Sequence, residues 1–125
     1  MPPTAAVSTA LGDAADSLRV SQQGGTVTVV LDRAHRHNAI HLAMWHAFSR
    51  LMPVLAADDA VDVVVFRGPP GGPFSAGADI TEFQSLRSTP DSAERYGAAM
   101  LAGEAAIAGF PKPTVALVEG FAIGG

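Results

Sequence analysis

Glycine and other small residues gather in two segments of this chain, and each segment follows a strand-like run of apolar residues. The first is "GPPGGPFSAGADI" at residues 68–80, and the second is "EGFAIGG" at residues 119–125. Glycine is needed where a backbone turns with positive φ or comes close to another molecule. If the N–H groups of Ala78 and Gly125 converge, they form an oxyanion hole, a pair of donors for a negatively charged oxygen. The alternative is that both segments are ordinary glycine-rich turns.

A small set of strands and helices must position these segments. Runs rich in β-branched residues predict strands, and apolar residues at helical spacing predict helices. The expected strands are residues 18–23, 26–31, 61–67 and 114–120, with Gly24 and Gly25 in the turn of a hairpin between the first two. The expected helices are residues 40–57, 78–87 and 90–110. This order, with connections long enough for crossover helices, predicts an α/β layered domain.

Several details of these elements can be predicted from single residues. Asn38 is a candidate cap for the helix over 40–57, and Pro53 is expected to kink or weaken the end of that helix. The strand over 61–67 is apolar at nearly every position, which is typical of a central parallel strand covered on both faces. The strand over 114–120 is expected to be buried as well. In α/β sheets, ligands gather at the carboxyl edge of such strands.

Composition limits the class of protein. The chain has 125 residues, 48% hydrophobic and 16% charged, which suits one compact domain. Its formal net charge is −4 and Lys112 is its one lysine, so a nucleic-acid partner is not expected. The absence of cysteine excludes disulfides and thiolate chemistry and fits a reducing compartment. No apolar run is long enough to cross a bilayer, and residues 1–17 resemble no targeting signal, so we expect a disordered tail there and a cytoplasmic protein.

The two glycine segments, taken together, resemble those of a known family. "GGPFSAGADITEF" after a valine-rich strand, followed by "PKPTVALVEGFAIGG", is similar to the enoyl-CoA hydratase/isomerase (crotonase) family. "LDRAHRHNAI" looks like the family's loop that ends in Asn-Ala before its first helix. The resemblance covers residues 18–125. It implies a crotonase-type, ClpP-like spiral of β-β-α units, incomplete at the carboxyl end, assembled as a homotrimer or hexamer when full length.

The resemblance also implies roles for individual residues in acyl-CoA thioester chemistry, the hydration or isomerisation of an enoyl-CoA in fatty acid metabolism. Ala78 and Gly125 match the two backbone donors to the thioester oxygen, and coenzyme A belongs to the substrate, so no separate cofactor is expected. The positions matching the acyl-CoA channel are Ala76, Asp79, Ile80 and Thr81. Those matching the loop at the nucleotide end are His35, Arg36 and His37. For Asp79, the residues themselves favour a structural role, accepting N–H bonds in the turn, over a role as acid or base.

The family's two acid/base glutamates match positions beyond Gly125. The chain is therefore expected to be the amino-terminal part of a crotonase-type protein, without hydratase activity on its own. Glu82 and Glu104 match neither glutamate position and are interpreted as solvated helix charges. A truncated, non-catalytic acyl-CoA-binding or oligomerising module is the alternative function.

Two other kinds of site receive weak support from the sequence. His37 and His41 have the i, i+4 spacing that can hold zinc on a helix, but no carboxylate accompanies them, so we expect no metal. Ser75 does not fit the Gly-x-Ser-x-Gly pattern of a hydrolase nucleophile.

Overall fold

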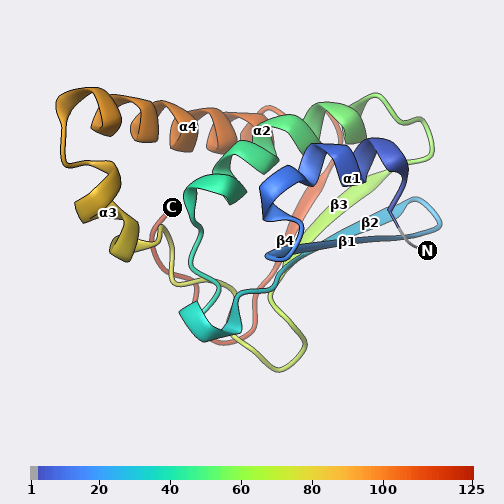
Figure 1. The fold of residues 1–125 in the computed structure, drawn as a ribbon. Coiled ribbons are helices and arrows are strands. Elements are labelled where there is room, and N and C mark those ends of the chain that lie inside the picture. The colour runs from blue at the N-terminus through green and yellow to red at the C-terminus, as the bar shows by residue number, and fades with distance from the viewer. Residues whose placement is uncertain (1–2) are drawn as a thin grey trace.

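The computed structural model describes residues 3–125, except for the side chain of Phe83. The strands are β1 (Leu18–Gln23), β2 (Thr26–Leu31), β3 (Val63–Arg67) and β4 (Thr114–Leu117). The α-helices are α1 (Ala5–Leu11), α2 (Leu42–Ala56), α3 (Ile80–Leu86) and α4 (Pro90–Ala108), and the 3-10 helices are η1 (Gly12–Ala14) and η2 (Ala34–Arg36). Helices α1, α2 and α4 lie on one side of the sheet (Figure 1). The predicted order of elements from β1 to β4 and the α/β class are confirmed.

The four strands form one sheet in the order β1-β2-β3-β4. β1 and β2 are an antiparallel hairpin, and Gly24 in its turn has a φ of 59°. β3 pairs in parallel with β2 on one side and with β4 on the other, so the central parallel position predicted for it is confirmed. Because β2, β3 and β4 run in the same direction, the segments that follow them all leave from one edge of the sheet (Figure 1).

The hydrophobic core lies between the sheet and α2. Along β2 every second residue is buried, as expected for a strand with one face toward the core. Phe48 of α2 packs edge-on against Phe66 of β3, with ring centroids 6.2 Å apart. Trp45, one turn earlier, packs edge-on against Phe48 at 6.0 Å. The apolar residues that predicted the helix thus form its buried face.

The ends of α2 differ from those predicted. His41, and not Asn38, caps the helix: its Nδ1 accepts the N–H of Met44 at 3.2 Å. Asn38 has left-handed backbone, with a φ of 57°, and its side chain binds elsewhere. At the other end the helix continues through Pro53 to Ala56. Lys112 supports this end, since its Nζ donates to the carbonyl oxygen of Asp58 at 2.7 Å.

Helix α4 crosses α2 at a glycine. A Cβ on Gly103 would lie 2.8 Å from the carbonyl oxygen of Trp45 and 3.0 Å from its ring carbon Cε3. The two backbones approach closely here because Gly103 has no side chain. Helix α4 begins with a capping box, in which Thr89 and Ser92 exchange side-chain to backbone hydrogen bonds, and Pro90 stands in its first turn.

The prediction of a disordered tail over residues 1–17 is wrong for the helix α1. Val7, Ala10 and Leu11 are buried against the core, and Thr4 caps the helix by accepting the N–H of Val7. Arg50 of α2 donates to the carbonyl oxygen of Ala10 at 2.9 Å, at the end of α1. The helix has only 7 residues, too few to be stable in isolation, so the packing of its three buried residues against the core stabilises it. Residues 1 and 2, which also belong to the predicted tail, lie outside the described residues.

The prediction that residues 114–120 form a buried strand is wrong in two respects. The strand ends at Leu117, and all four of its residues are exposed. β4 is the edge of the sheet, paired only with β3 among the described strands. The apolar residues of this strand, whose sequence predicted burial, therefore lie at the surface: Val115 is 47% exposed and Leu117 is 42% exposed.

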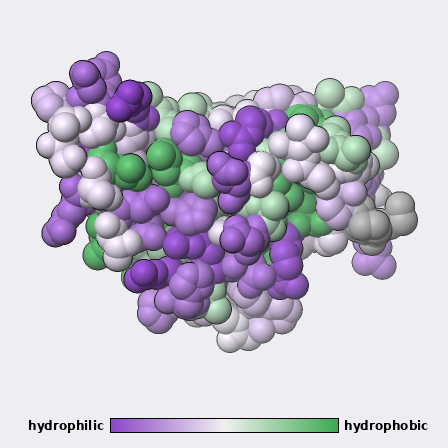
Figure 2. Space-filling model, in the orientation of Figure 1, coloured by the Kyte–Doolittle hydropathy of each residue, from purple (hydrophilic) through white to green (hydrophobic). Residues whose placement is uncertain are grey.

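The surface in Figure 2 is hydrophilic across its lower half, over η2 and the neighbouring loops, whereas hydrophobic residues show between the helices above. Within residues 3–125, none of the helices combines the length and the hydrophobicity needed to cross a bilayer.

Candidate functional site

The two glycine segments, far apart in the sequence, lie side by side at the carboxyl edge of the sheet. Ser75 and Ala122 form a parallel bridge. In it, Ile123 N–H donates to the Ser75 carbonyl oxygen at 3.1 Å, and Phe74 N–H donates to that of Phe121 at 3.1 Å. The backbone itself, rather than side chains, joins the segments.

Glycine is required where the segments touch. Gly77 has a φ of 89° and Gly124 a φ of 78°, in the region that side chains disfavour. A Cβ on Gly77 would lie 2.6 Å from the carbonyl oxygen of Ile123, and a Cβ on Gly124 would lie 3.4 Å from the Cα of Gly77. Gly77 is thus explained by positive φ and by close approach, as the sequence predicted for the opening segment, and Gly124 by its positive φ.

A third segment, between β2 and α2, completes the arrangement. Ile40 N–H donates to the Gly77 carbonyl oxygen at 2.8 Å, and Asp79 N–H donates to that of Ile40 at 2.9 Å, which forms a parallel bridge between Ile40 and Ala78. Ala76 N–H donates to the carbonyl oxygen of His37 at 3.1 Å. The segment that contains Ala78 is therefore held between two neighbouring loops.

Ala78 and Gly125 keep their backbone donors free. Each directly follows one of the two touching glycines, Gly77 and Gly124. Among the residues that the structure describes, the N–H of Ala78 and the N–H of Gly125 donate to no protein acceptor. Unpaired backbone donors are uncommon unless water or a ligand takes them. These two N–H groups are therefore without a protein acceptor in residues 3–125.

Buried polar side chains hold the loops in place through hydrogen bonds to their backbone. Asn38 accepts the N–H of Arg33 at 2.8 Å and donates to the carbonyl oxygen of Pro73 at 2.9 Å. Ser75 Oγ donates to the Asn38 carbonyl oxygen at 2.8 Å and accepts the N–H of Gly77 at 3.0 Å. Sequence reasoning missed this role of Asn38, although an asparagine in a loop is a common left-handed residue with local hydrogen bonds. Ser75 is used as a structural link.

Asp79 is buried and holds a hydrogen-bonded ion pair. Its Oδ2 lies 3.2 Å from Nη1 of the buried Arg33, and its Oδ1 accepts both the N–H and the hydroxyl of Thr81, at 3.0 and 2.6 Å. Burial alone raises the pKa of the Asp79 carboxyl, but the hydrogen bonds from Thr81 and Arg33 outweigh it and lower the pKa below its ordinary value of 3.8. The backbone acceptor role predicted for Asp79 is seen in the bond from Thr81.

An open groove of about 570 Å³ adjoins the glycine segments. Gly77, Gly124 and Gly125 form one part of its wall, and Trp45 and Ile107 belong to the helical side. Most of the lining side chains are apolar, with Glu104 as the acidic exception. An apolar groove with a few polar groups at one end is the usual form of a small-molecule site.

Sequence comparison places the chain in a family. The family profile described as "Enoyl-CoA hydratase/isomerase" matches residues 26–125. The chain belongs to the enoyl-CoA hydratase/isomerase family. Among curated relatives, a probable enoyl-CoA hydratase of Rhizobium meliloti (strain 1021) is 34% identical over 110 residues, covering 88% of this chain and 41% of that protein. Enoyl-CoA delta isomerase 2 of Rattus norvegicus is 33% identical over 106 residues, covering 84% of this chain and 27% of that protein.

Solved structures of the enoyl-CoA hydratase/isomerase family have the same fold. An enoyl-CoA hydratase/carnithine racemase from Magnetospirillum magneticum matches with a TM-score of 0.77 and 32% identity, over 82% of this chain and 39% of that one. The expected fold class, an incomplete crotonase fold, is thus confirmed. The chain spans less than half the length of these relatives.

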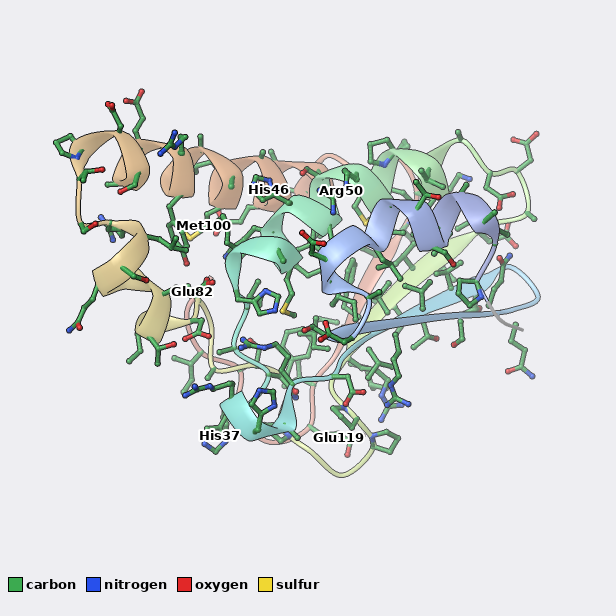
Figure 3. The ribbon with its side chains drawn as sticks, viewed as in Figure 1. His37, His46, Arg50, Glu82, Met100 and Glu119 are labelled. Atoms are coloured by element: carbon green, nitrogen blue, oxygen red, sulfur yellow. The ribbon has the colours of Figure 1, made fainter. Side chains whose placement is uncertain are left out.

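The remaining residues that the family resemblance assigned to substrate lie around the same loops. His35, Arg36 and His37 are exposed on η2 and just after it, and Figure 3 shows His37 beside this helix. The ring centroids of His37 and Phe121 lie 6.0 Å apart. Ile80 is 72% exposed at the start of α3. Ala76 and Thr81 are tied into the loop by their hydrogen bonds to His37 and Asp79.

The two histidines considered as zinc ligands, His37 and His41, have different surroundings. His41 accepts from Met44 through Nδ1, and its Nε2 lies 3.2 Å from Ser17 Oγ, so both ring nitrogens already have partners. His37 lies on the exposed loop instead. In the described part of the chain, no group of three His, Asp or Glu side chains is placed to hold a metal ion.

Two acidic side chains have structural roles that the sequence did not suggest. Glu82, interpreted as a solvated charge, accepts the N–H of Leu42 at 2.8 Å and so joins α3 to the start of α2 (Figure 3). Glu119 binds Arg67 at 2.8 Å and accepts the N–H of Gly71 at 3.1 Å, which holds the loop after β3. An acceptor near a helix N-terminus is favoured by the helix dipole, but only the fold brings Glu82 to Leu42.

Proposed function

We propose that the chain takes part in acyl-CoA thioester chemistry, the hydration or isomerisation of an enoyl-CoA, with the thioester oxygen bound by the N–H groups of Ala78 and Gly125. The observation that supports this proposal most directly is the contact between Gly77 and Gly124, because the residue after each glycine, Ala78 or Gly125, has an N–H that donates to no acceptor among the described residues. Membership of the enoyl-CoA hydratase/isomerase family supports the class of reaction.

Two backbone donors favour the reaction because they bind the charged oxygen of the enolate more strongly than the neutral oxygen of the thioester. A thioester carbonyl becomes an enolate when charge develops on its oxygen, and preorganised N–H groups stabilise this charge more than the neutral carbonyl. Removing one such donor costs about 100- to 1,000-fold in rate in enzymes of this kind. The buried network of Asn38, Ser75 and Asp79 supports the site by holding the donor loops rigid.

The rest of the substrate is assigned in the same proposal. The acyl group lies in the apolar groove, next to the loop formed by Ala76, Asp79, Ile80 and Thr81. For Asp79, whose carboxylate is engaged with Arg33 and Thr81, the contribution is through backbone and loop position. The nucleotide end of coenzyme A meets the exposed loop of His35, Arg36 and His37, where Arg36 supplies a cation for phosphate. Coenzyme A then belongs to the substrate, and no separate cofactor is involved.

Hydration requires one group to activate water and another to protonate the α-carbon. The family's two glutamates match no position within these 125 residues, so we propose that the chain by itself does not hydrate an enoyl-CoA. Loss of the enoyl thioester absorbance at a rate above the buffer blank contradicts this. Binding of an acyl-CoA without turnover is the behaviour of the alternative, a non-catalytic binding or oligomerising module.

The oxyanion assignment is tested by replacing Ala78 in the protein as its gene encodes it. Ala78→Pro deletes the N–H donor, and kcat/KM for a short enoyl-CoA is expected to fall by about 100- to 1,000-fold. Ala78→Val keeps the donor and crowds the loop, so its effect is expected to be smaller. Circular dichroism and Tm check that both variants fold, because proline also fixes φ. A folded Ala78→Pro variant with wild-type kcat/KM refutes the assignment.

A further inference from the structure

Helix α4 places one carboxylate in the groove beside the second donor loop. Glu104 is half-buried and lines the groove together with Ile107, one turn later on the same helix. Its Oε1 lies 2.8 Å from the position that a Cβ on Gly125 would occupy. Glu104, expected to be a solvated helix charge, is partly exposed and lines the groove. Because Gly125 has no side chain, the carboxylate can occupy the space beside it.

The Glu104 carboxylate has no partner among the residues that the structure describes. Within residues 3–125, Glu104 makes no hydrogen bond and no ion pair, unlike Asp79, Glu82 and Glu119, which each bind a named donor. The neighbouring groove residues Trp45, Ile107 and Val115 present mostly apolar surface. A carboxylate in an apolar groove is one of the few polar groups that can orient a bound ligand there. Its placement calls for a ligand atom to interact with.

We propose that Glu104 transfers the proton at the α-carbon of the acyl group whose thioester oxygen is bound at Ala78 and Gly125. This inference rests on the proposed function. The α-carbon is two bonds from the thioester oxygen, so a base beside the donor of that oxygen is within reach of the α-proton. Glu104 is thereby a catalytic residue supplied by α4.

The step conserves atoms and electrons. The Glu104 carboxylate takes the α-proton, the C–H electron pair forms a double bond between the α-carbon and the carbonyl carbon, and the carbonyl π pair moves to the oxygen. That oxygen is then an enolate bound by the two N–H groups. Return of the proton from the Glu104 carboxylic acid to the α-carbon regenerates the thioester. In an unsaturated acyl group, delivery of the same proton to the γ-carbon of the dienolate leaves the carbon–carbon double bond at a new position. No oxidant or reductant is needed.

The position of Glu104 beside an oxyanion site is consistent electrostatically. Before the transfer the negative charge is on Glu104 and the thioester oxygen is neutral, and afterwards Glu104 is neutral and the oxygen carries the charge. The two negative charges do not coexist, so the repulsion that raises the energy of paired carboxylates is avoided. The same total charge stays in the groove throughout the step.

The test is hydrogen exchange at the α-carbon of butyryl-CoA in D2O, followed by NMR, with the protein as its gene encodes it. A saturated acyl group cannot be hydrated, so exchange reports the α-carbon step alone. We expect Glu104→Gln to slow exchange by about 100-fold or more. Glu104→Asp keeps the carboxylate and should recover part of the rate. Glu94→Gln, which makes the same charge change at an exposed site on α4, should leave exchange unchanged.

The dissociation constant of butyryl-CoA, measured by calorimetry for each variant, separates the possible failures. Equal affinity in wild type and Glu104→Gln, with loss of exchange only in the variant, supports the proposal. Wild-type binding without exchange, or exchange that survives in Glu104→Gln, overturns the role of Glu104 and leaves acyl-CoA binding intact. Absence of binding in the wild type overturns the proposed function itself, and the role of Glu104 with it.

Discussion

Asp79 shows how a single charge stabilises the site. Its carboxylate is buried and is bound by Arg33 and Thr81, which lowers its pKa below 3.8. A carboxyl with a lowered folded-state pKa contributes stability that is fully present above its unfolded-state pKa and is lost as the pH falls through the folded-state value. We therefore expect the free energy of unfolding to decrease below about pH 4, where this carboxyl takes up its proton.

Asp79→Asn tests this linkage. It leaves Arg33 buried without its ionic partner, so the free energy of unfolding at pH 7 is expected to fall by about 3 kcal/mol. Urea unfolding at pH 7 and at pH 3 should show a smaller loss on acidification in the variant than in the wild type. Thr81→Val, which removes the hydroxyl bond but keeps the ion pair, should have a smaller effect at pH 7. If the free energy of unfolding falls equally on acidification in Asp79→Asn and in the wild type, other carboxyl groups are responsible for the loss of stability at low pH.

At the scale of elements, the crossing of α4 and α2 depends on Gly103. Alanine has a higher helix propensity than glycine by about 1 kcal/mol. At Gly103, however, a Cβ would lie 2.8 Å from a backbone oxygen of Trp45, and this clash is with main chain that cannot rotate away. We expect Gly103→Ala to lower the free energy of unfolding by about 1–3 kcal/mol.

Gly97 supplies the matched control on the same helix. A Cβ there would meet no heavy atom within 4 Å. Only propensity then acts, and Gly97→Ala is expected to raise the free energy of unfolding by up to about 1 kcal/mol. Urea unfolding of the two variants measures both effects. A stabilising Gly103→Ala would mean that the helices separate easily at their crossing.

The contact between the two glycine segments gives a second prediction at this scale. Gly77 and Gly71 both have positive φ, 89° and 80°, so alanine is strained at either position. Only at Gly77 would a Cβ also press on the other segment, 2.6 Å from Ile123 O, whereas at Gly71 it would meet nothing within 4 Å. We expect Gly77→Ala to weaken acyl-CoA binding by about tenfold or more, equivalent to about 1.4 kcal/mol, and Gly71→Ala to leave it unchanged.

Calorimetric titration with an acyl-CoA, together with the Tm of each variant, measures this difference. Both variants should lose some stability from the strained φ, about 1 kcal/mol each. Equal binding by both would indicate that the contact of Gly77 with the second segment does not shape the site.

For the whole molecule, the feature that matters most for association is the exposed apolar edge of the sheet at β4. Val115, Leu117, Val118, Phe121 and Ile123 are each between 41% and 62% exposed on or just after β4. An unpaired apolar edge strand invites association with another chain. We expect the 125-residue chain to self-associate in a concentration-dependent way, as seen by size-exclusion chromatography with light scattering.

Val118→Lys should shift this equilibrium toward the monomer, because a lysine on an edge opposes pairing. Leu101→Lys is the control, since Leu101 is 64% exposed on α4, away from the edge. A chain that stays monomeric and melts cooperatively at high concentration would show that the edge is tolerated in water.

The sequence by itself determined most of the local structure. The runs rich in β-branched residues on either side of Gly24 and Gly25 predicted β1 and β2 with the bounds observed, and the helical spacing of Trp45, Phe48 and Leu51 predicted α2 and its buried face. These signals are local, since they depend on periods of two or 3.6 residues within one element. The pairing of the two glycine motifs was also enough to indicate the family.

Only the tertiary structure decided which residues of different elements meet. Nothing near Glu104 in the sequence distinguishes it from Glu94, yet one lines the groove beside Gly125 and the other is exposed. Helix α1 forms because α2 offers an apolar face and Arg50 to residues that would not hold a helix alone. Asn38 does not cap α2, because its side chain is hydrogen-bonded to the backbone of Arg33 and Pro73. In each case the deciding contact joins residues distant in the chain, and the free energy of such contacts depends on burial and geometry that no local pattern encodes.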